Sequence, residues 1–554
     1  MKVRTLFTGL LLVSLFFSFG FVTHLSDDYY EISKNLDIFG RLYKEINTLY
    51  VEDTDPEGLM RVGIDAMLES LDPYTNYISE DDVEDVRFMS TGQYGGIGAL
   101  IGKQDTQLMI LEPYQGYPAD QAGLKAGDVL KQVDGKEVTE DMQVADVRNL
   151  LRGEKGGKVQ MTVDRPGQAT PITVELIRDR IKIKNVPYAG LVNEEVGYIA
   201  LSGFTQDAGK EVRAALERMK KESAALKGVI LDLRSNPGGR LDESVKVANT
   251  FLPQREVVVE TRGRSENTSR THKATQPPVD IEIPLVVLVN NRSASAAEIV
   301  AGAVQDLDRG IILGQRSFGK GLVQNIRPLS YNTQLKITTA KYYTPSGRCI
   351  QAINYAERNE DGSVSRIPDS LMTAFRTRGG RTVYDGGGIA PDVEMAPRRL
   401  HPISQALIDQ GLIFDFATQF TNKTPVIPGP RKFEISQTIY DAFLAFVNQQ
   451  TFTYETRADY ELDKLRKIVD AEAYTASLNK SLEALEQELD QQKDLDLNKH
   501  QEEISILLKA EIVKRYFYQE GLTQASFDQD GEILRAIELL TEGEEYQKLL
   551  KGEI

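Results

Sequence analysis

The sequence predicts a multidomain α/β protein with an N-terminal helical segment, a small β-rich module, an α/β core and a helical C-terminal extension. Three observations lead to this prediction. The chain has 554 residues, enough for about three or four domains of ordinary size. Residues 187–400 alternate strand-like and helix-like runs, which is typical of an α/β core. Residues 431–554 contain no proline and carry leucines at helical spacing.

Composition excludes several classes of protein. Apolar residues make up 41% of the chain and charged residues 27%, which is typical of soluble globular domains. The net charge of −17 argues against nucleic acid, because that binding depends on Lys and Arg at phosphates. The single cysteine, Cys349, excludes an internal disulfide, and the four histidines show no ligand spacing. We therefore expect no cofactor, no metal and no nucleic-acid partner.

The first residues predict export. Lys2 and Arg4 precede a nearly continuous apolar run over residues 6–22, long for a signal peptide and short for a spanning helix. Residues 1–23 are therefore either a cleaved signal peptide or an N-terminal membrane anchor. No A-x-A cleavage site stands out after them. Both interpretations place the bulk of the protein outside the cytoplasm, in the periplasm or cell envelope.

The next elements follow from periodicity. Residues 30–90 are polar-amphipathic and predict helices, with a break at Asp72-Pro73. Residues 92–182 alternate short apolar runs with turns, which indicates a β-rich module. Within 187–400 we expect strands at 197–201, 229–233, 257–260, 285–289, 311–313 and 335–340, and helices near 206–223, 241–251 and 296–307.

The C-terminal extension is helical and acidic. A Pro/Gly-marked linker at Pro425–Pro430 precedes residues 431–554, which contain 26 acidic and 15 basic residues. An amphipathic stripe is formed by Leu478, Leu482, Leu485 and Leu489. The acidic charge is most simply a solvated helix face. The extension has three candidate roles, which are capping of the core, dimerisation, or holding an adaptor.

The β-rich module carries a peptide-binding pattern. A glycine cluster at Tyr94–Gly98 precedes a β-like run, and residues 122–130 read Ala-Gly-Leu-Lys-Ala-Gly-Asp-Val-Leu. Glycines permit close backbone approach, and an open groove beside a strand accepts a peptide by strand addition. The module resembles a PDZ domain of the kind fused to proteases. The resemblance implies that Gly96, Ile97 and Gly98 form the loop that binds a C-terminal carboxylate.

A serine lies where the predicted strand 285–289 turns into a helix. Residues 293–304 begin Ser-Ala-Ser and continue with small residues that leave room for a substrate backbone. At a helix entry, unpaired N–H groups and the helix dipole stabilise an oxyanion. An N-cap serine is the simpler interpretation of such a residue. A serine nucleophile also needs a base.

The base is a lysine rather than a histidine in our interpretation. The chain has no G-x-S-x-G motif, and His272, the one histidine of the core, lies in a polar stretch. Lys320 lies between two glycines, and burial lowers a lysine pKa from about 10.4 by up to several units. Residues 314–320 also fit G-x-x-x-x-G-K. Gly321 and a strand-like run follow instead of Ser or Thr and a helix, which argues against a nucleotide-binding loop.

Residues 231–239 read Leu-Asp-Leu-Arg-Ser-Asn-Pro-Gly-Gly. This is a buried strand that ends in a turn, and its N–H groups could face the serine as part of an oxyanion hole. The simpler interpretation is an ordinary β–α turn.

Together these segments resemble the C-terminal processing peptidases, or tail-specific proteases, a serine–lysine family with a PDZ domain. The resemblance covers roughly residues 35–397 and includes Ser70–Tyr74, Lys341–Arg348 and Gly386–Asp392. It implies a core of the ClpP/crotonase-like α/β type. It also assigns residues 30–90 to the N-terminal helical region, 92–182 to the PDZ domain, 187–400 to the protease core and 431–554 to the C-terminal domain.

The resemblance also assigns roles to site residues. Ser295 would be the nucleophile, Lys320 the general base and Gln324 the residue that orients the lysine amine. The N–H groups of Ala296 and of Gly238 or Gly239 would form the oxyanion hole. The family usually has Ser-Ala-Ser-Ala-Ser, whereas Ala297 ends that run here. The neighbouring hydroxyl of Ser293 remains an alternative nucleophile at this point.

The sequence therefore predicts an exported serine endopeptidase that cleaves near the C-terminal region of protein substrates. Its expected substrates are unfolded proteins or proteins with an apolar C-terminus, and its PDZ module would recognise them and gate the site. Its expected further partner is an adaptor or a second copy, bound through the helical tail. The alternative is a non-catalytic peptide-binding adaptor or an envelope scaffold on the same fold.

Overall fold

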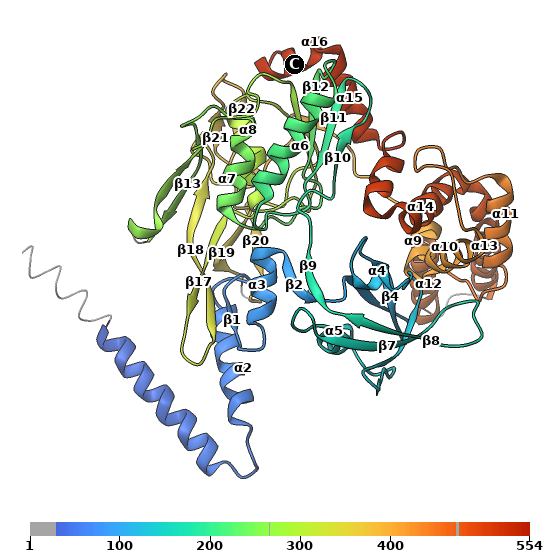
Figure 1. Cartoon of the computed structure of the whole chain (residues 1–554). Coiled ribbons are helices and arrows are strands. Elements are labelled where there is room, and N and C mark those ends of the chain that lie inside the picture. The colour runs from blue at the N-terminus through green and yellow to red at the C-terminus, as the bar shows by residue number, and fades with distance from the viewer. Residues whose placement is uncertain (1–28, 265, 360, 473–475) are drawn as a thin grey trace, which may run out of the picture. The chain divides into compact units, whose positions relative to one another are not determined.

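The computed structural model describes residues 29–554, except 265, 360 and 473–475 (Figure 1). Two compact units are described here separately: one is formed by residues 1–80 and 324–338, the other by residues 81–323 and 339–554. The export segment expected at residues 1–23 lies outside the described residues. Among the described residues, no helix combines the length and the apolar character that crossing a bilayer requires.

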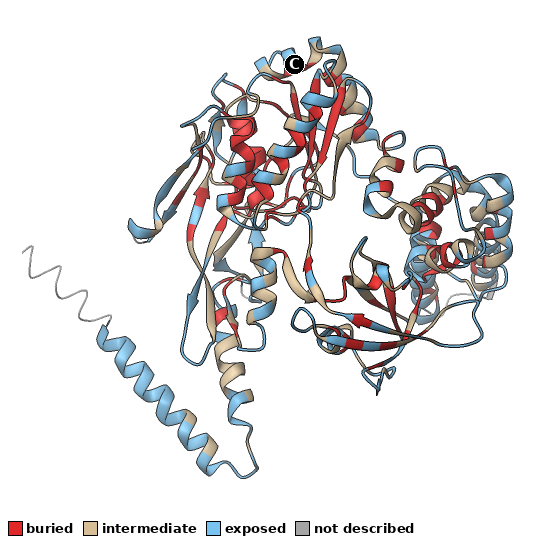
Figure 2. Cartoon of the chain, in the orientation of Figure 1, coloured by how far each residue is buried: buried red, intermediate tan, exposed pale blue. Residues whose placement is uncertain are grey.

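The smaller unit begins with a helix over residues 29–49, most of which is exposed (Figure 2). Asp55 then caps α2 (Pro56–Glu69), whose first residue is a proline, as expected at a helix start. The chain next forms β1 (Asn76–Ile78), which pairs antiparallel with residues 334–336. The turn before β1 is held by Asp72, whose carboxylate accepts hydrogen bonds from Tyr74 N and Thr75 N at 2.8 and 2.9 Å.

The second unit opens with α3 (Val83–Thr91) and the PDZ module. Its main sheet has the order β3-β4-β5-β7-β8, and β2 pairs with β9. The helix α5 (Val144–Leu151) buries Val147 and Leu151 in the module's core. The strands are β2 (Gln93–Gly96), β3 (Ala99–Gln104), β4 (Gln107–Pro113), β5 (Val129–Val133), β6 (Lys136–Glu137), β7 (Lys158–Asp164), β8 (Ile172–Ile177) and β9 (Asp179–Lys182), and the short helix α4 is Pro118–Gln121.

The α/β core is built on a six-stranded sheet of order β10-β11-β12-β15-β16-β23. The neighbours from β11 to β23 pair parallel, and β10 is antiparallel to β11. The strands are β10 (Tyr188–Leu191), β11 (Val196–Ala200), β12 (Gly228–Asp232), β15 (Leu285–Val289), β16 (Ile311–Gly314) and β23 (Val393–Glu394). Every residue of β12 and β15 is buried, which explains their continuous apolar runs.

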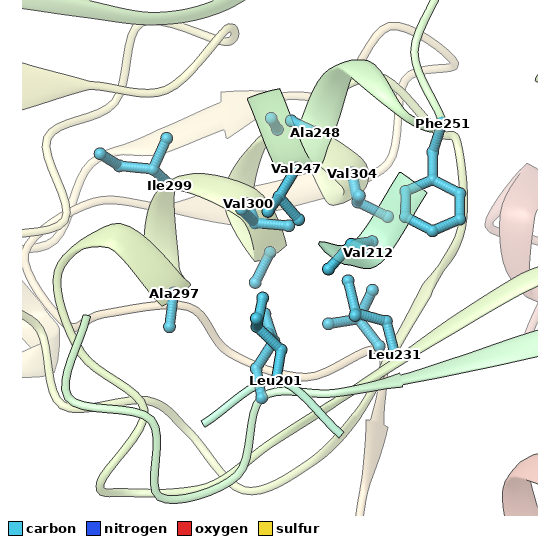
Figure 3. Close-up of a cluster of buried hydrophobic side chains, with 14 of the residues drawn as sticks. Leu201, Val212, Leu231, Val247, Ala248, Phe251, Ala297, Ile299, Val300 and Val304 are labelled. Atoms are coloured by element: carbon cyan, nitrogen blue, oxygen red, sulfur yellow. The ribbon is translucent and has the colours of Figure 1, made fainter. Parts of the chain in front are cut away.

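One face of this sheet is covered by α6 (Ala208–Glu222), α7 (Leu241–Asn249) and α8 (Ala296–Asp306). Figure 3 shows their side chains gathered with those of the strands, including Val212, Val247, Val300 and Leu231. The helix α8 is buried throughout, so its small residues allow close packing.

The C-terminal helices cover the opposite face. Residues of α15 (Gly531–Glu542) and α16 (Glu544–Lys551) share a hydrophobic core with strand residues that point away from α6–α8, such as Ile230 and Leu288. Figure 1 shows α15 beside β11 and β12. The Tyr546 hydroxyl accepts a hydrogen bond from Leu285 N at 3.0 Å. The end of the chain therefore supplies a layer of the α/β core, which corresponds to the capping role among the alternatives predicted for the tail.

A second group of strands lies outside the main sheet. In the larger unit, β13 pairs with β14 and with residues 340–343 of β18. Short ribbons are formed by β19 with β20 and by β21 with β22. The elements are β13 (Val257–Gly263), β14 (Arg270–Lys273), β17 (Leu322–Pro328), β18 (Gln334–Tyr343), β19 (Ile353–Arg358), β20 (Val364–Arg366), β21 (Ala374–Arg376) and β22 (Thr382–Tyr384), with single 3₁₀ turns at Glu266–Thr268 and Asp369–Leu371.

The helices before α15 form a bundle with its own core, which includes Phe416, Phe443 and Leu508. Of the predicted leucine stripe, Leu482 and Leu489 pack against α12, whereas Leu478 and Leu485 are exposed. The helices are α9 (Pro402–Asp409), α10 (Leu412–Lys423), α11 (Gln437–Val447), α12 (Arg457–Ala471), α13 (Ala476–Lys499) and α14 (Gln501–Ser526).

The bundle also contacts the PDZ module. The Tyr518 hydroxyl donates a hydrogen bond to Asp120 Oδ1 at 2.6 Å, and Gln519 Nε2 donates to Glu112 Oε2 at 2.7 Å. Tyr518 interrupts α14 with a φ of 54°, which a non-glycine residue rarely adopts. The fold therefore has the predicted architecture of a helical segment, a small β-rich module, an α/β core and a helical C-terminal region.

Candidate active site

Ser295 lies between β15 and α8, immediately before the first residue of the helix. Its φ is 55° and its ψ −113°, which is strained for a non-glycine residue and costs of the order of 1–3 kcal/mol. Such strain persists only where surrounding contacts hold it. The residue is half-buried, at the edge of a well-packed core.

Ser293, the alternative nucleophile, is fully buried. Its hydroxyl donates to Leu233 O at 2.8 Å and accepts from Asn290 N at 2.9 Å. The Ser293 hydroxyl thus acts as both a donor and an acceptor, and it joins the loop before α8 to the end of β12. The geometry favours Ser295 as the reactive hydroxyl and gives Ser293 a structural role.

Glu298, three residues after the serine, connects the serine and lysine segments. One carboxylate oxygen, Oε2, accepts from Ser295 N at 2.7 Å and from Lys320 N at 2.9 Å. The other, Oε1, accepts from the Ser317 hydroxyl at 2.5 Å and from Gly319 N at 2.7 Å. Because Ser295 and Lys320 share one acceptor atom, their backbones are neighbours in space.

The Glu298 carboxyl is fully buried, and burial raises its pKa to about 7 against the lowering effect of the four hydrogen bonds. Sequence reasoning did not identify this residue. The signal was present, because a serine followed three residues later by a glutamate is a helix-entry pattern. Its second function, which is to bind a distant loop, could not be inferred from that pattern.

The loop that carries Lys320 is anchored on the serine loop at further points. Phe318 N donates to Ser293 O at 3.0 Å. The buried Tyr342 on β18 places its hydroxyl 3.1 Å from Ser295 O and also in contact with Lys320 O. Lys320 itself is half-buried. Tyr342 is a second functional candidate that no sequence motif singled out.

The turn after β12 packs directly against Ser295. A Cβ atom on Gly238, whose φ is 97°, would lie 2.7 Å from Ala294 O and 2.9 Å from Ser295 Cβ. Only glycine therefore fits at this position. The buried Asn236 fixes the turn, because its side chain donates to Leu201 O and its carbonyl accepts from Ala294 N at 2.9 Å.

The oxyanion candidates differ in how their N–H groups are used. Gly238 N already donates to Asn236 Oδ1 at 2.9 Å. Within the described part of the chain, Gly239 N has no hydrogen-bond acceptor. Ala296 is the first residue of α8, so the helix ladder does not use its N–H. The geometry therefore favours Gly239 with Ala296 over Gly238.

Gln324 lies on β17 and belongs to the smaller unit. Its side-chain amide donates to Thr338 Oγ1 at 3.1 Å. The Thr338 amide in turn donates to Thr75 Oγ1 at 3.2 Å, and Thr75 is buried beside Asp72. This network, within the smaller unit, orients the Gln324 side chain.

The PDZ loop residues lie at the end of β2 and before β3. Ile97 is buried, and Gly98 has a φ of 73° with Tyr117 packed against it. The strand β3 is an edge of the module's sheet, and α5 packs beside it. An edge strand next to a helix is the arrangement that binds a peptide by strand addition.

Other candidates from the sequence lie elsewhere. His272 is on β14, where burial and then Arg270 lower its pKa. The residues after Gly321 form the strand β17, which agrees with the rejection of a nucleotide-binding loop. Burial raises the pKa of the Cys349 thiol, which keeps it in the protonated form.

Comparisons with known proteins identify the family of the chain. Residues 195–357 match the model of peptidase family S41, residues 109–165 that of the PDZ domain, and residues 403–540 that of a C-terminal helical domain of probable PDZ-proteases. The chain is 38% identical to the carboxy-terminal-processing protease of Bartonella bacilliformis over 322 residues, covering 58% of this chain and 73% of that protein. It belongs to peptidase family S41.

Two further comparisons each cover 66% of the chain. The carboxy-terminal processing protease CtpA of Bacillus subtilis is 32% identical over 369 residues, which are 66% of this chain and 76% of that protein. The solved structure of a photosystem II D1 C-terminal processing protease is 26% identical, with a TM-score of 0.35, over 66% of this chain and 93% of that one. The family models and the two sequence relatives confirm the resemblance to C-terminal processing peptidases, and the protein is a serine-type peptidase with a PDZ domain.

Proposed function

We propose that this S41 peptidase is an exported endopeptidase whose nucleophile is Ser295 and whose general base is Lys320. The supporting observation is the shared carboxylate of Glu298, which holds the Ser295 and Lys320 backbones together. Gln324 would orient the lysine amine. The PDZ loop Gly96, Ile97 and Gly98 would bind the C-terminal carboxylate of the substrate, and substrate binding would gate the site.

The chemistry follows from these groups. The Ser295 Oγ attacks the carbonyl carbon of the peptide bond, and its proton passes to the neutral amine of Lys320. The oxyanion formed is stabilised by the N–H groups of Ala296 and Gly239. Lys320 then gives the proton to the leaving amine as the C–N bond breaks. Water hydrolyses the acyl-enzyme with Lys320 again as base.

Substrates of this site are unfolded proteins or proteins with an apolar C-terminus, since the β3 edge accepts an extended chain. The leader at residues 1–23 supports a location in the periplasm or cell envelope, either released or anchored. An adaptor or dimer partner would bind through the exposed surface of the bundle.

The test is cleavage of an unfolded protein with an apolar C-terminus by the wild type, Ser295→Ala and Lys320→Ala. Lys341→Ala, an exposed lysine on β18, is the matched control and keeps full activity. Both active-site variants bind the substrate and do not cleave it. A serine-reactive phosphonate, mapped by mass spectrometry, labels the peptide at Ser295. Cleavage by Ser295→Ala, or labelling at Ser293 instead, would refute the assignment.

A further inference from the structure

The turn after β12 is joined to the C-terminal helices by a cluster of charged groups, which we name the Arg234 clamp. It consists of Arg234, Asp232, Asp530 and Glu532. The Arg234 guanidinium donates to both carboxylate oxygens of Asp232, at 2.6–3.0 Å. Its Nη1 donates to Asp530 Oδ2 at 2.8 Å and to Glu532 Oε2 at 2.6 Å. One planar guanidinium thus holds three carboxylates from two distant parts of the sequence.

The clamp is largely shielded from solvent. The side chains of Arg234 and Glu532 are 17% and 14% exposed. Burial, the largest single effect, opposes the charge on Arg234, but the contacts with Asp232 and Asp530 together outweigh it, so the pKa of Arg234 is raised. The Tyr198 hydroxyl donates to Asp232 Oδ2 at 2.5 Å from the neighbouring strand. Charge-assisted, bidentate contacts of this kind fix geometry more strongly than an exposed ion pair.

The clamp is covalently continuous with the turn that packs on the nucleophile. Ser235, next to Arg234, has a φ of 57°, so the backbone is strained at that point. Ser235 N donates to Asn290 Oδ1 at 2.9 Å, which joins the turn to the loop before α8. Gly238, three residues later, lies against Ser295. A shift of Arg234 would therefore be transmitted to the oxyanion side of the site.

The clamp residues themselves line a cavity of about 840 Å3 between the tail and the core. Its walls include Ser235, Asn290 and Arg292 from the core, and Lys509 and Gln529 from the tail. The ion pairs of the clamp join the start of α15 directly to the turn.

We propose that Asp530 and Glu532 are positioning residues for proteolysis, which act through Arg234 on the turn that packs against Ser295. The C-terminal helices are then part of the catalytic apparatus and not only a cover for the sheet. This inference rests on the proposed role of Ser295. It assigns a function to tail carboxylates that lie almost 300 positions from Arg234 in the sequence.

The test uses the full chain and the near-isosteric double variant Asp530→Asn/Glu532→Gln. Glu538→Gln, on the same helix and paired with Arg535 at an exposed site, is the matched control. We expect the double variant to lower kcat at least tenfold with KM within twofold of wild type, because substrate binding lies elsewhere. Arg234→Lys, which keeps the charge and loses the planar fork, reproduces this loss. Adding Arg234→Lys to the double variant lowers kcat little further, since the three residues act as one unit.

Two results would overturn the proposal. One is an unchanged kcat in the double variant. The other is a loss of activity that disappears when rates are expressed per folded molecule, with the folded fraction taken from circular dichroism. Each leaves the nucleophile assignment standing, provided that Ser295→Ala is inactive in the same assay. Activity of Ser295→Ala would instead reject the proposed function.

Discussion

Glu298→Gln tests the connection between the serine and lysine loops. The glutamate accepts four hydrogen bonds, two at each oxygen. A glutamine keeps one acceptor oxygen and presents an NH2 group at the other position. Its best orientation turns that group toward Ser317, whose hydroxyl can accept, and leaves Gly319 N without a partner. One buried, unpaired N–H costs about 1–3 kcal/mol of unfolding free energy.

The same substitution removes a titrating group. The folded-state pKa of Glu298 is about 7 and lies above the ordinary 4.5, so the folded protein binds more protons between these values. Stability contributed by this group is therefore complete below about pH 4.5 and is lost as pH rises through 7. A shift of this size corresponds to about 3 kcal/mol, at 1.36 kcal/mol per pKa unit.

The assay is urea unfolding of wild type and Glu298→Gln from pH 5 to 8, followed by circular dichroism because the chain has no tryptophan. The stability of the wild type falls relative to that of the variant as pH rises. At every pH, kcat of the variant is at least tenfold lower, because Ser295 and Lys320 lose part of their common anchor. Parallel pH profiles, or an unchanged kcat, would refute this account of Glu298.

Three further predictions concern the turn after β12, the C-terminal helices and the contact of the bundle with the PDZ module. Gly238→Ala places a Cβ 2.8 Å from Ala296 N at a positive φ. We therefore expect a folded protein whose kcat for peptide cleavage is reduced at least tenfold. A near-normal kcat would contradict this prediction. Deletion of residues 527–554 uncovers one face of the core sheet and removes six large buried apolar side chains. At about 1.5–3 kcal/mol each, the loss is as large as the whole stability of a typical domain. The truncated chain is therefore expected in the insoluble fraction, and a soluble, active product would reject the layer assignment. Tyr518→Phe removes a hydrogen bond to Asp120 and costs about 1 kcal/mol of stability. We expect faster amide exchange in α4 and unchanged exchange in β15. Equal exchange in α4 of the variant and the wild type would show that this contact does not hold the PDZ module.

The main elements of the core could be predicted because their signals are local. The strand 285–289 and the helix that follows it match β15 and α8, since a buried parallel strand is continuously apolar and a helix entry has its own residue pattern. The serine and lysine motifs could be found for the same reason. Each motif is a short loop whose residues are neighbours in the chain.

The choice between Ser293 and Ser295 required coordinates. Both serines fit a helix entry, and only the contacts of Ser293 with Leu233 and Asn290 show that its hydroxyl is occupied. The role of Glu298 also required coordinates, because its two carboxylate oxygens bind a loop that is some twenty positions away in the sequence. Hydrogen bonds between distant loops leave no periodic trace in a sequence.

The C-terminal helices show most clearly which features the sequence predicts and which depend on the folded structure. Its helical and acidic character follows from composition and periodicity, which are properties of neighbouring residues. Its attachment to the sheet depends on which apolar faces meet, and many partners are compatible with one amphipathic helix. Folding pairs α15 with Ile230 and Leu288, and places Glu532 on Arg234. These contacts depend on complementary surfaces that are formed only once the chain has folded.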